Sequence, residues 1–268
     1  MPKYLYEIPD LVILVGFTIL VPAYAYILYS GLRFIFRKRE LPHDAYLGIN
    51  MFNSTIAISA FLLTFTLVQA FGTIQNINSE ISEETAIIEQ LDRFLISIRD
   101  SESMDIRDKL KQYIRSVITK EWMELRSESG RFKVSKEFTD LFNAATHALT
   151  LSTTQHHDLY EKSVTHVEEL GRLRHHRMKH VGKGISPIFF FGIFLLITTS
   201  ILFFFYLSKK NVFSANALLF QMTALGTLCG LIVVYDQPFN GESGVTAKAY
   251  ERTLEMMDER IALYGDHK

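Results

Sequence analysis

The chain has 268 residues, of which 48% are hydrophobic and 21% charged, and its net charge is −1. A net charge this close to zero argues against a nucleic-acid partner, which would need a basic face. The single cysteine excludes a disulfide within the chain.

Charged residues are segregated along the chain instead of being mixed with apolar ones. Four stretches contain no Asp, Glu, Lys, Arg or His: 11–32, 45–79, 184–208 and 211–235. Each is longer than the roughly 20 apolar residues that cross a hydrocarbon core about 30 Å thick. The sequence therefore predicts an integral membrane protein that is all-α, with four transmembrane helices in two hairpins flanking a helical soluble domain.

The charge map sets the expected domain boundaries. We expect a first hairpin over 1–79, a helical soluble domain over 80–183, a second hairpin over 184–235 and a tail with an amphipathic helix over 236–268. The expected transmembrane helices cover about 9–36, 45–75, 184–208 and 211–235. In the soluble part, 100–105 is typical of a turn, with Asp105 as the expected cap of the next helix.

The second charge-free stretch differs from the others in length and polarity. As one helix, 45–79 would be about 50 Å long, so it must tilt or project beyond the bilayer. At 100° per residue its polar residues divide between two faces. One face holds Asn50, Asn53, Ser54, Ala57, Phe61, Thr64, Phe65 and Val68. The other holds Thr55, Ser59, Thr66 and Gln69, which we expect to join neighbouring helices through hydroxyl hydrogen bonds.

The first of these faces has an order that suits a pore. Amides and a hydroxyl come first, then small Ala57, then bulky Phe61 and Phe65. Around an axis, such helices would form a polar vestibule and an apolar constriction, and apolar constrictions gate ion flow by dewetting. Ala57 is too small to close a pore, so Phe61 would do most of the narrowing. Spacing alone favours ordinary helix packing over a pore. The lack of acidic and basic side chains in this stretch disfavours an ion-coupled pump.

The soluble part offers candidate binding residues but no catalytic motif. Glu80, Glu83 and Glu84 form either a solvated helix face or, in a ring of subunits, an acidic exit that favours cations. His176 and His180 have a spacing that can bind zinc, but no Cys or suitable Glu lies nearby in sequence. A solvated basic helix is the simpler interpretation, and pH sensing is another. We expect no enzyme activity, no cofactor and no metal site.

Two residues of the soluble part, Tyr113 and Trp122, flank an apolar stripe. They are expected to anchor the core of the helical domain and not to contact a ligand.

Several short motifs resemble the bestrophin-like domain family of bacterial membrane proteins. They are the post-span motif Asp236, Pro238, Phe239 and Gly241, the run Glu83-Glu84-Thr85-Ala86, and the helix with Tyr113 and Glu121-Trp122. More distantly the layout is similar to the bestrophins, pentameric anion channels whose second helix lines the pore. That resemblance implies a neck at Ala57, Phe61 and Phe65, although Ala57 departs from the bulky pattern. No acidic run follows Gly241, so we expect no calcium clasp.

Together these observations lead to two functional hypotheses. The first is a homopentameric ion channel in a bacterial inner membrane, with passive conduction and a preference for anions such as chloride implied by the resemblance. Its partners would be other copies of itself, the lipid bilayer and inorganic ions. The alternative is a non-conducting membrane scaffold or sensor that acts through its helical domain. Basic residues flank the spans on both sides, so charge leaves sidedness open, whereas the resemblance implies a cytosolic helical domain.

Overall fold

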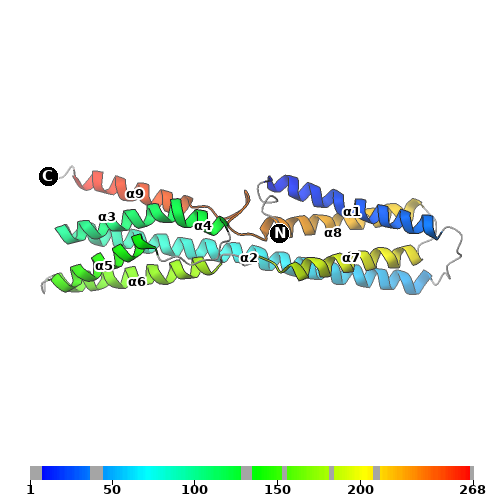
Figure 1. Ribbon diagram of the computed structural model, residues 1–268, viewed down its shortest axis with the longest axis horizontal. Helices are drawn as coiled ribbons and strands as arrows, with labels where there is room; N and C mark the ends of the chain where they lie inside the picture. Colours follow the sequence, from blue (N-terminus) through cyan, green and yellow to red (C-terminus); the bar gives the residue numbers. More distant parts are fainter. Residues whose placement is uncertain are drawn as a thin grey trace. The chain divides into compact units, whose positions relative to one another are not determined.

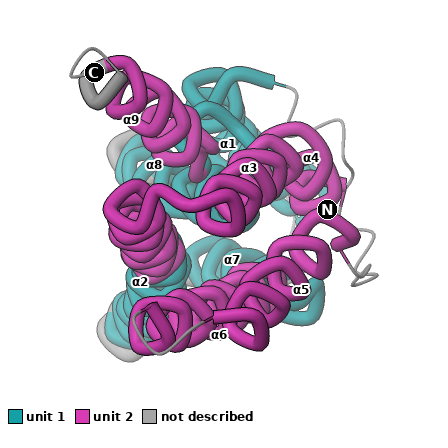
Figure 2. Tube along the Cα trace, turned by 90° about the vertical axis from the view of Figure 1, so that its left-hand side faces the viewer, with its two compact units in different colours: residues 1–74, 184–244 teal, residues 75–183, 245–268 magenta. Residues whose placement is uncertain are grey.

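The protein is described by a computed structural model that covers 8–36, 45–127, 135–152, 156–180, 184–207 and 212–265. Across these ranges every regular element is a helix, which confirms the all-α prediction. The chain divides into two compact units (Figures 1 and 2). The membrane unit is 1–74 with 184–244, and the helical unit is 75–183 with 245–268. The basic turns at 37–44 and 208–211, on which sidedness depends, lie outside the described residues.

The membrane unit contains the predicted transmembrane helices. They are α1 (Asp10–Ile35), the first part of α2 (Ala45–Ile98), α7 (Pro187–Leu207) and α8 (Val212–Tyr235). All four are long and apolar enough to cross a membrane. Because α2 is one unbroken helix of 54 residues, it is about 80 Å long. This confirms that the second helix extends beyond the span of a bilayer.

A close approach of two backbones joins α1 to α8. A Cβ added at Gly226 would lie 2.6 Å from the carbonyl oxygen of Phe17, and one at Gly230 would lie 3.1 Å from the α1 backbone. The Thr18 and Thr227 hydroxyls are hydrogen-bonded across the same seam, at 3.1 Å. Small residues four apart allow membrane helices to pack closely. In lipid the hydrophobic effect does not drive helices together, so van der Waals contact stabilises their association instead.

This seam gives the first testable prediction. Gly226→Ala is expected to destabilise the membrane unit by about 1–3 kcal/mol, because the added methyl overlaps fixed backbone. Gly192→Ala is the matched control, since nothing lies within 4 Å of a Cβ there. Denaturation of both variants in detergent measures the difference. Equal midpoints would contradict the packing argument.

One side of α2 is buried along its length. Buried residues recur every three or four positions, from Phe52 and Ile56 in the membrane unit to Leu91 and Leu95 in the helical unit. In the membrane unit this stripe packs in one core with Ile197 and other residues of α1, α7 and α8. The opposite side of α2 is left exposed. Because these buried residues recur about every 3.6 positions, they stay on one side of α2, and the same side contributes to the apolar interior of both units.

The helical unit is a bundle around the second part of α2. It comprises α3 (Ser101–Ser116), a π-helix η2 (Val117–Glu121), α4 (Trp122–Ser127), α5 (Lys136–Leu151), α6 (His157–Lys179) and α9 (Lys248–Gly265). Tyr113 and Trp122 are buried in it, which confirms their expected place in the core.

The start of α3 corrects the predicted turn and cap. The helix begins at Ser101, and the cap is Asp100, whose Oδ1 accepts a hydrogen bond from the Ser103 amide at 2.8 Å. Asp105 lies inside the helix, so its assignment as a cap was wrong. Burial alone would raise the pKa of Asp100, but hydrogen bonds from Tyr160 and Ser103 outweigh it and lower the pKa. The run of Asp and Ser residues offers several caps, and sequence does not distinguish between them.

Candidate functional site

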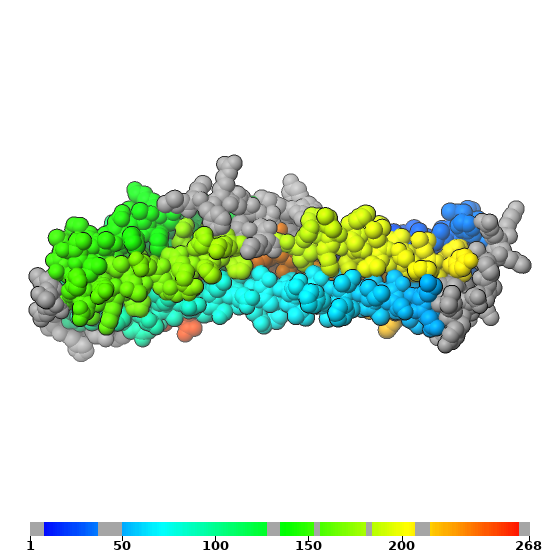
Figure 3. Space-filling view, turned by 90° about the horizontal axis from the view of Figure 1, so that it is seen from below, coloured from blue at the N-terminus to red at the C-terminus, as the bar shows by residue number. Residues whose placement is uncertain are grey.

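The residues predicted to line a pore all lie on the exposed side of α2. They are Asn50, Asn53, Ala57, Phe61, Thr64, Phe65 and Val68. The three large apolar residues, which follow the polar ones along the helix, are well exposed: Phe61 at 70%, Phe65 at 54% and Val68 at 63%. Figure 3 shows residues of α2, in light blue to cyan, at the surface of the chain. Exposed apolar patches of this kind mark contact with another protein, lipid or ligand.

Three hydroxyls of the second polar face of α2 donate within α2 itself. The hydroxyls of Thr55, Ser59 and Thr66 donate to carbonyl oxygens four residues earlier in α2, at 2.8–2.9 Å. Ser59 and Thr66 are buried, whereas Gln69 is exposed. Within one chain these hydroxyls therefore bond locally, because the carbonyl four residues back is the nearest acceptor in a helix. The expected bonds to helices of other copies stay a prediction.

The acidic stretch that follows is not a uniform solvated face. Glu83 is exposed and Glu80 is partly buried, while Glu84 is 1% exposed. A carboxylate this deeply buried needs partners, because an unpaired buried charge is very costly. Glu84 therefore departs from the expected exit ring, and only Glu80 and Glu83 remain candidates for it.

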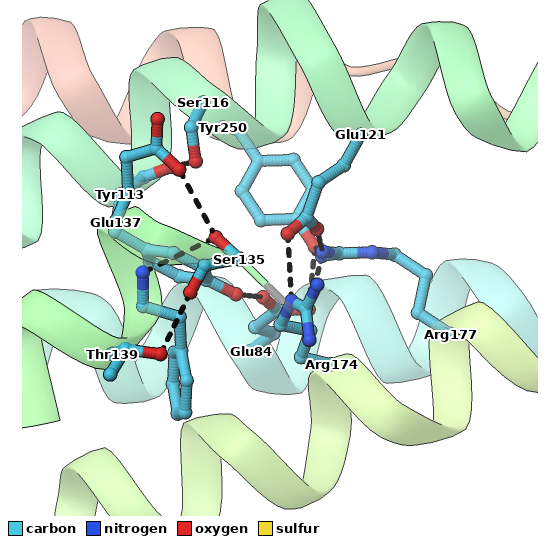
Figure 4. A network of polar contacts seen from close by, with 11 residues as sticks. Glu84, Tyr113, Ser116, Glu121, Ser135, Glu137, Thr139, Arg174, Arg177 and Tyr250 are labelled. Carbon is cyan, nitrogen blue, oxygen red and sulfur yellow. Dashed lines mark hydrogen bonds and ion pairs between the residues drawn. The ribbon is translucent and has the colours of Figure 1, made fainter. Parts of the chain in front are cut away.

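The partners of Glu84 form a buried network inside the helical unit (Figure 4). Tyr113 donates to Glu84 Oε1 at 2.7 Å. Tyr250 and Arg177 donate to Glu84 Oε2, at 2.7 and 2.5 Å. Arg177 also donates to Glu121 Oε2 at 2.6 Å. One charged centre thus links α2, α3, η2, α6 and α9.

The charges in this network support one another. Burial by itself would lower the pKa of Arg177, but Glu84 and the neighbouring groups more than offset this, and the pKa is raised well above its ordinary value. Burial and the Glu84 carboxylate raise the pKa of Tyr113 in the same way. Arg177 is therefore permanently charged, and Tyr113 is a permanent donor.

The π-helix explains how Glu121 reaches this centre. A π-turn accommodates an extra residue within a helix and redirects the side chains around it. Glu121 is the last residue of η2, and its Oε1 also accepts a hydrogen bond from Arg174 Nε at 2.7 Å. π-Helical turns often occur at functional sites. Here the turn aims a carboxylate into the core of the unit.

A second buried ion pair fastens α9 to the rest of the helical unit. Arg107 Nε lies 2.6 Å from Asp92 Oδ1, and both side chains are fully buried. Arg107 also donates to the carbonyl oxygen of Met257 in α9, at 2.5 Å. Arg260 of α9 pairs with the other oxygen of Asp92. A charged residue of α2 thus holds a helix that lies some 150 residues later in the chain.

The post-span motif folds back onto the start of α1. Asp236, Pro238 and Phe239 are buried, and Asp236 accepts a hydrogen bond from the amide of Ile185. Gly241 has a φ of +80°, and a Cβ there would lie 2.9 Å from Asp10 Oδ1. Glycine suits this position because the left-handed conformation strains other residues.

Asp10 also binds the chain just beyond Gly241. Its Oδ2 accepts a hydrogen bond from the amide of Ser243 at 2.7 Å. The motif therefore connects the beginnings of α1 and α7 to the end of α8 within the membrane unit. Among the residues that the structure describes, no three His, Cys, Asp or Glu side chains are arranged to hold a metal ion.

Sequence reasoning missed Arg177, Tyr250, Asp92 and Arg107 as partners. The available signal was their register: Arg177 follows Val167 and Leu170 on the buried stripe of α6, and Arg107 adjoins Ile106 and Leu110 on that of α3. A charged residue in an apolar register indicates a buried pair.

Comparison with known proteins agrees with this fold. The family profile of the bestrophin-like domain matches residues 20–250. No curated protein matches the chain.

Solved structures with the same fold share little sequence with the chain. One variant of a bacterial bestrophin homologue from Klebsiella pneumoniae is 15% identical, with a TM-score of 0.60, over 92% of this chain and 98% of that one. A second variant is 13% identical, with a TM-score of 0.61, over 93% and 98%. A structure described as a membrane protein has a TM-score of 0.64 at 12% identity, over 91% and 97%. The chain is a membrane protein that belongs to the bestrophin-like domain family.

Proposed function

We propose that the protein is a passive ion channel in which several copies, five by analogy with the bestrophins, surround an axis with the exposed face of α2. The observation that carries this proposal is that face itself, which is free of charge, ordered from polar to apolar, and uncovered within the chain. In the ring, neighbouring copies of the chain would cover the two sides of the exposed α2 face. The middle of that face would point to the pore axis.

The apolar end of this face would act as the neck. Phe61, Phe65 and Val68 are spaced four and three residues apart, about one helical turn each, so rings of them would stack along the axis. A narrow apolar ring excludes water and so resists ions until it widens. The absence of Asp, Glu, Lys, Arg and His from residues 45–79 supports passive conduction over coupled transport.

The preferred ion is proposed from the family resemblance, which favours anions such as chloride. Rings of Glu80 and Glu83 beyond the neck would oppose this preference, because acidic rings attract cations. Reversal potentials measured in asymmetric potassium chloride distinguish an anion-selective channel from a cation-selective one, because the two give reversal potentials of opposite sign. The proposed location is a bacterial inner membrane, with the helical unit in the cytosol. No catalytic role, cofactor or resident metal is proposed.

The test is to record currents from purified protein in planar bilayers. Phe61→Ala is expected to raise conductance by roughly threefold to tenfold, because a wider neck lowers the dewetting barrier, and 1.4 kcal/mol is a factor of about ten. Phe220→Ala is the matched control, as this phenylalanine on α8 is also exposed but off the α2 face. An oligomer that stays silent across voltage, pH and calcium would overturn the proposal.

A non-conducting scaffold or sensor is the second candidate function. The helical unit is compact by itself, which favours a scaffold or sensor. Such a unit could bind a partner protein even if the membrane helices form no pore. It predicts a monomer or a closed dimer. Native mass in detergent distinguishes the two candidates, since a channel requires a ring.

A further inference from the structure

A histidine pair at the C-terminal end of α6, formed by His176 and the capping residue His180, meets a carboxylate of α2 inside the helical unit. His180 Nε2 lies 3.3 Å from Glu80 Oε2, and His176 Nδ1 lies 3.9 Å from Glu80 Oε1. The two histidines are one helical turn apart, so both face the same carboxylate. The sequence left them without an acidic partner because Glu80 is almost 100 residues away.

The carboxylate in this cluster is incompletely satisfied. Glu80 Oε2 is shielded from solvent and accepts no hydrogen bond from the residues that the structure describes. Its nearest imidazole is within reach but not aligned as a donor. A neutral imidazole has one N–H, whereas a protonated one has two, so protonation guarantees a donor toward Glu80.

Other charged residues near the cluster lie on the same two helices. On α2, Glu83 lies 3.8 Å from Arg172, and on α6, Arg172 is also paired with Glu169 at 2.6 Å. Two carboxylates, those of Glu83 and Glu169, therefore share the guanidinium of Arg172. Glu84 is the next acid on α2, but its charge is matched by Arg177 within the buried network.

We propose that Glu80, His176 and His180 form a proton-operated latch between α2 and α6. A protonated imidazole carries a positive charge and pairs with Glu80, which holds the two helices together. As the pH rises through the range in which imidazole ordinarily titrates, this attraction is lost, and Glu80 is left with a poorly satisfied oxygen. The latch is thus expected to tighten in acid and to loosen above neutrality.

The latch would regulate the proposed channel, and in this respect it rests on the proposed function. Glu80 lies on the same continuous helix as the proposed neck residues. Its partners lie in the last turns of α6, which leads within a few residues to the second transmembrane hairpin. A contact between these helices is therefore suited to alter how the pore helix is held.

A stability experiment tests the latch independently of conduction. The unfolding midpoint of the full chain in detergent is measured at pH 6 and pH 8. The latch is expected to add about 2–4 °C to the midpoint at pH 6 relative to pH 8. This increment should be lost in Glu80→Gln and in the double variant His176→Gln/His180→Gln. It should persist in Glu83→Gln and His175→Gln, which alter an exposed acid on α2 and an exposed histidine on α6.

A variant that keeps the positive charge distinguishes loss of charge from loss of side-chain packing. His180→Arg keeps a cation beside Glu80 at every pH tested, so its stability should change less between pH 6 and pH 8 than that of the unaltered chain. If Glu80→Gln or the double histidine variant keeps the full pH increment, the latch is wrong. If Glu83→Gln also abolishes it, the effect is diffuse, and the specific latch is again wrong.

Bilayer recordings at the same two pH values complete the test. If currents are present, they should differ between pH 6 and pH 8, and Glu80→Gln should remove the difference. A pH-independent current would refute regulation by the latch but leave the channel intact. A silent protein that still shows the stability increment would refute the channel and leave the latch intact.

Discussion

Arg177→Met is expected to destabilise the helical unit by about 3–5 kcal/mol. The substitution keeps much of the side-chain volume but removes the cation that pairs with Glu84 and Glu121. Breaking a buried pair is costly because the remaining charge stays in an apolar surrounding. Tyr113 and Tyr250 would still donate to Glu84, but two hydroxyls do not replace a full positive charge.

Far-UV circular dichroism during heating, together with limited proteolysis in detergent, measures this loss. Arg172→Met is the control, because Arg172 lies on the same helix and pairs with exposed acids. Adding Glu84→Gln to Arg177→Met should recover part of the stability, since it removes one uncompensated charge. If Arg177→Met behaves like Arg172→Met, the network does not support the unit as argued.

The sequence predicted the membrane helices well because the relevant physics is local. An uncharged stretch long enough to span a bilayer is visible in one dimension, and the backbone must satisfy its own hydrogen bonds there. The excess length of the second stretch also follows from counting residues, and α2 is continuous from Ala45 to Ile98. Neither inference required any knowledge of tertiary contacts.

The α2 faces were predictable only in part. Helical periodicity placed Phe61, Phe65 and Val68 together, and they share the exposed side. Periodicity does not reveal where a hydroxyl donates, and within one chain Ser59 and Thr66 donate to carbonyl oxygens of α2 itself. A threonine or serine always has a local carbonyl as a competitor.

The buried network could not be predicted from sequence spacing. Glu84 is adjacent to exposed Glu83, and the two look equivalent in the sequence. Only the fold separates them, because Arg177 and Tyr250 approach Glu84 from 93 and 166 residues away. Long-range pairing of this kind depends on the packing of several helices at once. The same reason explains why the partner of His180 was missed.

Asp92→Ala is expected to release α9 from the helical unit and to cost about 3–5 kcal/mol. The substitution leaves Arg107 fully buried without its counter-charge and also removes the partner of Arg260. Hydrogen exchange of the α9 amides should accelerate more than that of α3, because α9 depends on this pair for its attachment. Asp258→Ala is the control: its partner Lys111 forms a more exposed bridge, for which a loss below about 1 kcal/mol is expected.

The two buried pairs should be coupled through α9. This helix supplies Tyr250 to the network of Glu84 and also the groups that meet Asp92 and Arg107. If Asp92→Ala detaches α9, Tyr250 leaves Glu84 at the same time, so adding Tyr250→Phe should cost less than it does alone. A double-mutant cycle measures the shortfall. Strict additivity would mean that α9 stays docked through Tyr250, and that the Asp92 pair acts only on α2 and α3.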